Sequence, residues 1–200
     1  LWEEGYFREF FAPSELISPL PSDSESALTD VFHAAPVPGY EHRYFDCRLN
    51  RLRGGATATV SEADIPYLHL LDYDMGGVLK GLAYILPRKT YRADLSRLRQ
   101  RFLNSKKEIF LAHLAASDSL YHILSREEMR RLLCEADSWL RELYFRSAGT
   151  LLITFFSDHG NSLVPSQPVP LRRFLKEHGW RLTKSLRGPR DVVVPAYGLV

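Results

Sequence analysis

The sequence predicts an α/β domain with a mostly parallel sheet, and three apolar segments separated by helices carry this prediction. Residues 109–112 and 151–156 are short apolar runs of the kind that form buried strands, and residues 191–197 are a third candidate strand. A long helix separates the first two segments, and a shorter one at 170–178 precedes the third. Strands joined through helices run parallel, so this order indicates one sheet.

Helical periodicity is clearest over residues 125–146. Ser125 and Glu128 form a capping-box pattern, and Gly149 follows the segment as a stop signal. Between them, apolar residues recur every three or four positions and mark one face: Met129, Leu132, Leu133, Ala136, Leu140, Leu143 and Tyr144.

Weaker signals predict the remaining elements. A short helix is expected within residues 1–12 and a Pro/Ser-rich loop over 13–25. A further helix runs from Ser26 to before Pro36, with Ser22, Asp23 and Ser24 as capping residues. Arg and Leu alternate at helical spacing over 91–104.

Length and composition are those of one globular domain spanning residues 1–200. The chain is 45% hydrophobic with a net charge of +2, which gives no support for nucleic acid as a partner. No segment reaches the roughly 18 consecutive apolar residues of a membrane span. Cys47 and Cys134 form no CxxC pair, so a zinc knuckle is excluded; two buried free thiols are favoured over a disulfide.

Both ends of the chain suggest that the domain is incomplete. The sequence starts at Leu1 without a methionine or a signal-type leader, and it stops at Val200 within an apolar run. The cellular compartment is therefore left open.

Asp158 and His159 directly follow the second predicted strand, where open α/β sheets place ligands. A carboxylate and an imidazole suit zinc or manganese, and Gly160 permits a sharp turn. The alternative is an ordinary capped loop with a surface histidine.

Asp118 and His122 follow the first predicted strand and are four residues apart. A helical turn beginning at Asp118 places both on one face, which is metal-ligand spacing. The alternative is an N-cap and an incidental histidine. If the two strands are neighbours, both Asp/His pairs lie at one rim, suited to two cations about 4 Å apart.

A nucleophile could come from Ser22, Ser24 or Ser26. All three lie near the start of the first predicted helix after the loop, where the helix dipole and backbone N–H groups favour a phosphate. A metal ion would lower the pKa of such a hydroxyl. Simple helix capping is the alternative reading.

Taken in order, these segments resemble the alkaline phosphatase superfamily, in particular its type I phosphodiesterase and nucleotide pyrophosphatase branch. Residues 21–24 are similar to the branch's Pro-Thr-x-Thr nucleophile segment, its Asp-x-x-x-His pair falls on Asp118 and His122, and its Asp-His-Gly motif on residues 158–160. The resemblance implies a three-layer α/β/α sandwich. It also implies Ser24 as nucleophile, a phosphoserine intermediate, and two divalent ions, zinc or alternatively manganese.

The resemblance has two gaps. No strand ending in a metal-binding Asp precedes Ser24, and His178 is the only histidine after the Asp-His-Gly motif. The function expected from the resemblance is a metal-dependent hydrolase of small-molecule phosphate esters, either diesters or monoesters. The alternatives are an inactive relative or binding module on the same fold, and a phosphotransferase or mutase.

Overall fold

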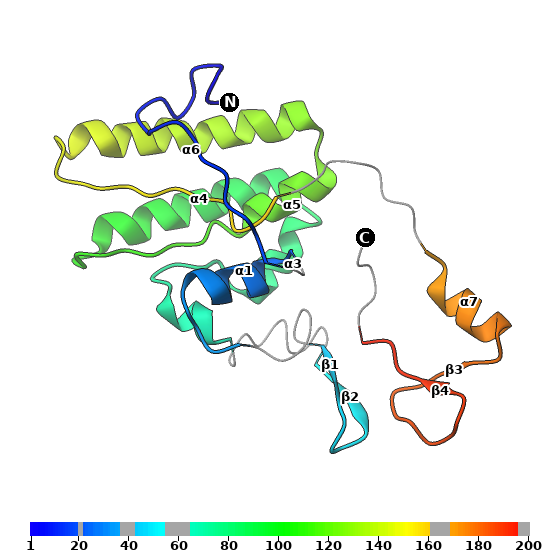
Figure 1. Cartoon of the computed structure of the whole chain (residues 1–200). Coiled ribbons are helices and arrows are strands. Elements are labelled where there is room, and N and C mark those ends of the chain that lie inside the picture. The colour runs from blue at the N-terminus through cyan, green and yellow to red at the C-terminus, as the bar shows by residue number, and fades with distance from the viewer. Residues whose placement is uncertain (20–21, 37–42, 55–64, 161–168, 196–200) are drawn as a thin grey trace. The chain divides into compact units, whose positions relative to one another are not determined.

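The computed structural model describes residues 1–19, 22–36, 43–54, 65–160 and 169–195 (Figure 1). The chain divides into two compact units. The first comprises residues 1–34 and 67–163, and the second comprises residues 35–66 and 164–200. The candidate serines and the two Asp/His pairs of the sequence analysis belong to the first unit.

Helices dominate the first unit. They are α1 (Ser24–Val31), α3 (Gly77–Ala83), α4 (Pro87–Asn104), α5 (Ala116–Ile123) and α6 (Arg126–Arg146), and the short 3-10 helix η1 (Pro66–Leu70) lies at the boundary between the units. Helices α4, α5 and α6 lie against one another, and α3 packs on α4 and α5 (Figure 1).

Local sequence signals explain where two of these helices begin. At α6, the Glu128 backbone N–H donates to Ser125 Oγ at 3.3 Å, as the capping pattern predicted. At α1, Asp23 is the cap: its carboxylate accepts from the backbone N–H and the hydroxyl of Ser26, at 3.0 and 2.8 Å. The predicted helices near residues 26–35, 91–104 and 125–146 are therefore confirmed.

The core of the first unit lies between α3, α4, α5 and α6. Tyr91, Ala116 and Leu120 are fully shielded from solvent, and the cluster is completed by Met75, Ala83, Met129 and Leu132. Burial of these apolar side chains is the main driving force for packing the helices together.

A ladder of ion pairs also joins α4 to α6. Arg88, Arg92 and Arg99 pair in turn with Glu128, Glu135 and Glu142. The residue numbers of the partners increase together along both helices, so α4 and α6 run parallel. Each pair is at least partly exposed and contributes little to stability.

Asp94 is a buried carboxylate on α4. The Tyr73 hydroxyl donates to Asp94 Oδ1 at 2.5 Å, and the Ala116 backbone N–H donates to Oδ2 at 3.0 Å. Burial raises the pKa of this carboxyl above its usual value, although both hydrogen bonds oppose that shift. Asp94 thereby ties the first residue of α5 to α4.

The described residues of the second unit form two small sheets and one α-helix. Strands β1 (Tyr44–Asp46) and β2 (Arg51–Arg53) form an antiparallel hairpin, while β3 (Arg181–Leu182) and β4 (Asp191–Val192) pair in parallel. Helix α7 (Leu171–Glu177) confirms the helix predicted over 170–178. The predicted third strand is reduced to β4, and residues 196 and 197 lie outside the described part.

The predicted fold class, a three-layer α/β/α sandwich with a mostly parallel sheet, is wrong. Each sheet found in the described residues has only two strands, and neither includes residues 109–112 or 151–156. One isolated parallel bridge, between Tyr73 and Ala112, is the nearest approach to the expected pairing. Residues 151–156 form neither a helix nor a strand in the described structure, and Leu152 is 92% exposed.

Smaller expectations also need correction. The predicted helix within residues 1–12 is a series of turns. Both cysteines are free, as predicted, but Cys47 is exposed and Cys134 only half-buried, so their predicted burial is wrong. Among the described helices, none is both long and apolar enough to cross a membrane.

Candidate functional site

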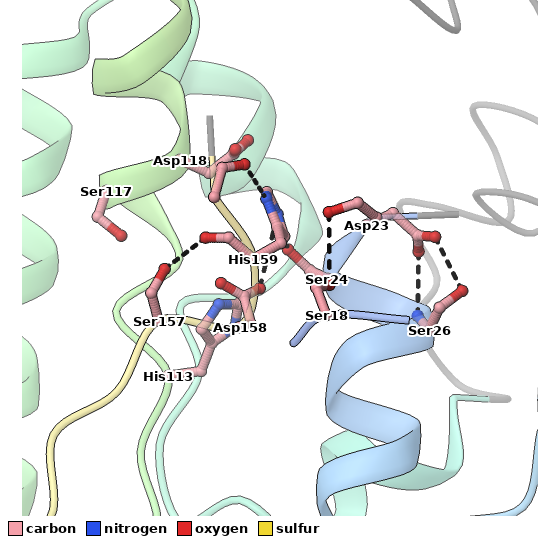
Figure 2. Close-up of polar contacts among 12 residues, drawn as sticks. Ser18, Asp23, Ser24, Ser26, His113, Ser117, Asp118, Ser157, Asp158 and His159 are labelled. Carbon is pink, nitrogen blue, oxygen red and sulfur yellow. Dashed lines mark hydrogen bonds and ion pairs between the residues drawn. The ribbon is translucent and has the colours of Figure 1, made fainter. Parts of the chain in front are cut away.

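Ser24 and His159 form a contact that brings two of the three predicted site segments together. Ser24 is the first residue of α1, and its Oγ lies 3.2 Å from His159 Nε2, although 135 positions separate the two residues in sequence (Figure 2). A hydroxyl within hydrogen-bond reach of an imidazole is the arrangement expected of an activated nucleophile.

The other nitrogen of His159 determines the direction of this hydrogen bond. Nδ1 lies 3.1 Å from the carbonyl oxygen of Gly160, which can only accept. In the neutral imidazole, Nδ1 therefore carries the hydrogen and Nε2 presents a lone pair. It follows that Ser24 Oγ donates its hydrogen to Nε2.

The neighbouring serines are engaged elsewhere. Ser26 donates to the capping carboxylate of Asp23, and the Ser22 hydroxyl lies 3.4 Å from that of Ser18 (Figure 2). Of the three candidate serines, Ser24 is the one placed against a histidine.

Asp158 supplies a carboxylate oxygen without a hydrogen-bond donor. Its Oδ2 is shielded from solvent and accepts no hydrogen bond from the described residues, and it lies 3.7 Å from His159 Nε2. An unpaired acceptor in such a position is energetically costly unless a cation or a protonated group lies nearby. Asp158 Oδ2 is therefore available to bind a cation or a protonated group.

Asp118 and His122 form the second pair, on α5. The helix confirms that both lie on one face, with His122 Nε2 3.3 Å from Asp118 Oδ1. The Tyr84 hydroxyl donates to Asp118 Oδ2 at 2.6 Å and fixes the orientation of the carboxylate. This pair is more exposed than Asp158 and His159.

The fit of these residues to metal ions is partial. The donors at Asp158, His159 and Ser24 are a carboxylate, an imidazole and a hydroxyl, which suit a zinc-type ion, and the unpaired oxygen of Asp158 would gain a partner. Within the described ranges, however, no three His, Cys, Asp or Glu side chains gather as a metal-holding group. Each Asp/His pair therefore offers two protein ligands.

A half-buried polar cluster around Asp74 was not predicted from the sequence. His113 Nδ1 lies 3.1 Å from Asp74 Oδ1, Lys80 Nζ lies 2.9 Å from Oδ2, and the Gly76 backbone N–H donates to Oδ2. Burial alone would raise the pKa of Asp74, but His113 and Lys80 outweigh it and lower the pKa to about 2. This cluster holds the chain five residues before Asp118.

The role of Tyr84 was also not predicted from the sequence. Its contact with Asp118 spans 34 positions and follows no recognisable spacing in the sequence. The sequence feature that could have indicated the Asp74 cluster is the pair of carboxylates, Asp72 and Asp74, in a short segment between helices. His178, the remaining candidate ligand, belongs to the second unit and has Nδ1 2.8 Å from the Phe174 carbonyl at the end of α7.

Comparison with known proteins adds no relative to this picture. The chain matches no protein-family model, no curated protein and no solved structure at the level of a significant match. The observations that bear on function are therefore the sequence motifs and the contacts of Ser24, Asp118, His122, Asp158 and His159.

Proposed function

We propose that this chain is a metal-dependent hydrolase of small-molecule phosphate esters, with Ser24 as the nucleophile. The observation that supports it most strongly is the 3.2 Å approach of Ser24 Oγ to His159 Nε2, next to the unpaired carboxylate oxygen of Asp158. The motif resemblance implies that these two segments belong to one site.

In the proposed reaction, Ser24 Oγ attacks phosphorus in line. A new O–P bond forms as the ester P–O bond breaks, the alcohol leaves with a proton, and water later cleaves the phosphoserine. The N-terminus of α1 favours the negative charge of the phosphoryl group, because the helix dipole points its positive end there. Asp158 and His159 would hold one divalent ion, and Asp118 and His122 the other.

The ions, when bound, would stabilise the serine alkoxide and the leaving oxygen. The lone pair of His159 Nε2 has two potential uses, because it either accepts the Ser24 hydroxyl or binds a cation. Turnover that requires a divalent ion would indicate that Nε2 binds the cation. Activity that survives full chelation would reassign the site to a metal-free Ser–His pair.

The test combines elemental analysis of the purified chain with an aryl phosphate ester assay before and after chelation. We expect close to two zinc or manganese ions per chain, turnover that chelation abolishes, and recovery on adding the metal back. Absence of both metal and turnover would contradict the proposal and favour a binding module. An added alcohol acceptor that collects the phosphoryl group would identify a phosphotransferase instead.

A further inference from the structure

A polar cavity lies on the first unit, formed by residues other than those of the Ser24 site. It has a volume of about 570 Å³, within the range of small-molecule pockets. One wall is the segment 72–75 and the other is the C-terminal half of α4, and together they contribute Asp72, Tyr73, Asp74, Met75, Arg97, Gln100, Arg101 and Asn104.

The two carboxylates of this cavity are already neutralised. Asp72 pairs with Lys107 and also accepts from the Leu111 backbone N–H at 2.9 Å. The hydrogen bond from Lys107 lowers the pKa of Asp72. Asp74 is held by Lys80 and His113, as described above. Both carboxylates therefore already have cationic partners other than the arginines on the opposite wall.

Arg97 and Arg101 are the charges without a counterpart. They are four residues apart on α4 and both line the cavity, and neither has a carboxylate partner among the described residues. By contrast, Arg92 and Arg99, on another face of the same helix, are paired with Glu135 and Glu142. The helix thus separates arginines that join it to α6 from arginines that face the cavity.

We propose that this cavity binds a small anion that bears a phosphate or carboxylate group. Guanidinium groups suit such ligands because their donors match two oxygens at once. Gln100 and Asn104 supply amide donors on the same wall. The site shares no residue with the Ser24 site, so it stands whether or not the chain hydrolyses phosphate esters.

The test is calorimetric titration of the full chain at low ionic strength, with inorganic phosphate and with succinate as separate probes. We expect saturable binding of at least one probe and a loss of affinity of about tenfold or more in the double variant Arg97→Gln/Arg101→Gln. The matched control is Arg92→Gln/Arg99→Gln, which removes two arginines from the other face and should bind as the wild type does.

A Ser24→Ala variant separates the two sites. Binding that persists in Ser24→Ala and is lost in Arg97→Gln/Arg101→Gln supports the cavity. Binding that follows Ser24 and ignores the arginines would overturn it, as would the absence of saturable binding of both probes. Preference for phosphate over succinate, or the reverse, identifies the ligand class.

Discussion

The two Asp/His pairs of this chain are built in different ways. Asp118 and His122 lie on one helix, four residues apart, and contact each other at 3.3 Å. Asp158 and His159 are adjacent on a loop, and their surroundings come from a segment more than 130 residues away, through the contact of His159 with Ser24. One pair is fixed by local helix geometry and the other by a long-range contact.

Under the proposed function, this difference indicates which pair turnover should depend on more strongly. A local pair needs only its helix and its anchors, whereas the Asp158 and His159 pair comes together with the candidate nucleophile only when the chain is folded. Asp158 is also the better shielded carboxylate and has an unpaired oxygen. We therefore expect the loop pair to be the more sensitive to substitution.

The largest expected effect is from Asp158→Ala. Turnover of an aryl phosphate ester should fall by about 1,000-fold or more, because the ion nearest Ser24 loses its carboxylate. Asp30→Ala, an exposed change on α1, is the matched control and should retain full rate. Full activity in Asp158→Ala, measured in steady-state assays, would remove the loop pair from the mechanism.

A smaller loss is expected for His122→Ala. Turnover should fall by about 100-fold, since one ligand of the other ion is lost while Tyr84 still positions Asp118. Elemental analysis should show the bound metal dropping from two ions to one. A loss equal to that of Asp158→Ala would show that the two pairs act as a single unit.

The anchoring of α5 is open to a stability test at Asp74. Its folded-state pKa is lowered to about 2, so its contribution to stability is complete above about pH 5 and is lost as the pH falls toward 2. Asp74→Asn should cost about 2 kcal/mol at pH 7 and much less near pH 2. Denaturant titrations at both pH values check this; an equal cost at both would contradict the ion-pair explanation.

The smallest effect is expected from Tyr84→Phe. Removing the hydroxyl takes one hydrogen bond from Asp118, worth about 1 kcal/mol, so turnover should fall by about fivefold. Tyr144→Phe on α6, which has no role in the site, is the control. Unchanged kinetics in Tyr84→Phe would show that helix geometry alone orients Asp118.

The same distinction between local and long-range structure explains what the sequence could predict. Helix α6 was predictable because Ser125 caps it and its apolar residues repeat at helical spacing. Residues 151–156 have an equally apolar composition, but a strand exists only with a hydrogen-bonded neighbour, and the described structure gives this segment none. Composition alone could not reveal that.

The candidate site likewise contains local features that the sequence predicts and long-range contacts that it does not. The spacing of Asp118 and His122 predicted their shared face from the sequence alone. The motif resemblance implied only that Ser24 and His159 belong to one site, and their direct contact was not predicted. No sequence pattern indicated the contacts of Tyr84 and His113. These contacts form between ordinary residues that folding brings together, so no local rule identifies them.

The most direct test of the proposed function is to identify the residue that carries the phosphoryl group. The chain is loaded with metal, incubated with an aryl phosphate ester, quenched in acid, and digested for mass spectrometry. We predict a phosphoryl adduct on Ser24 that disappears in Ser24→Ala and after chelation. Turnover without this adduct, or an adduct on Ser22 or Ser26 instead, would contradict the assignment of Ser24 as the nucleophile.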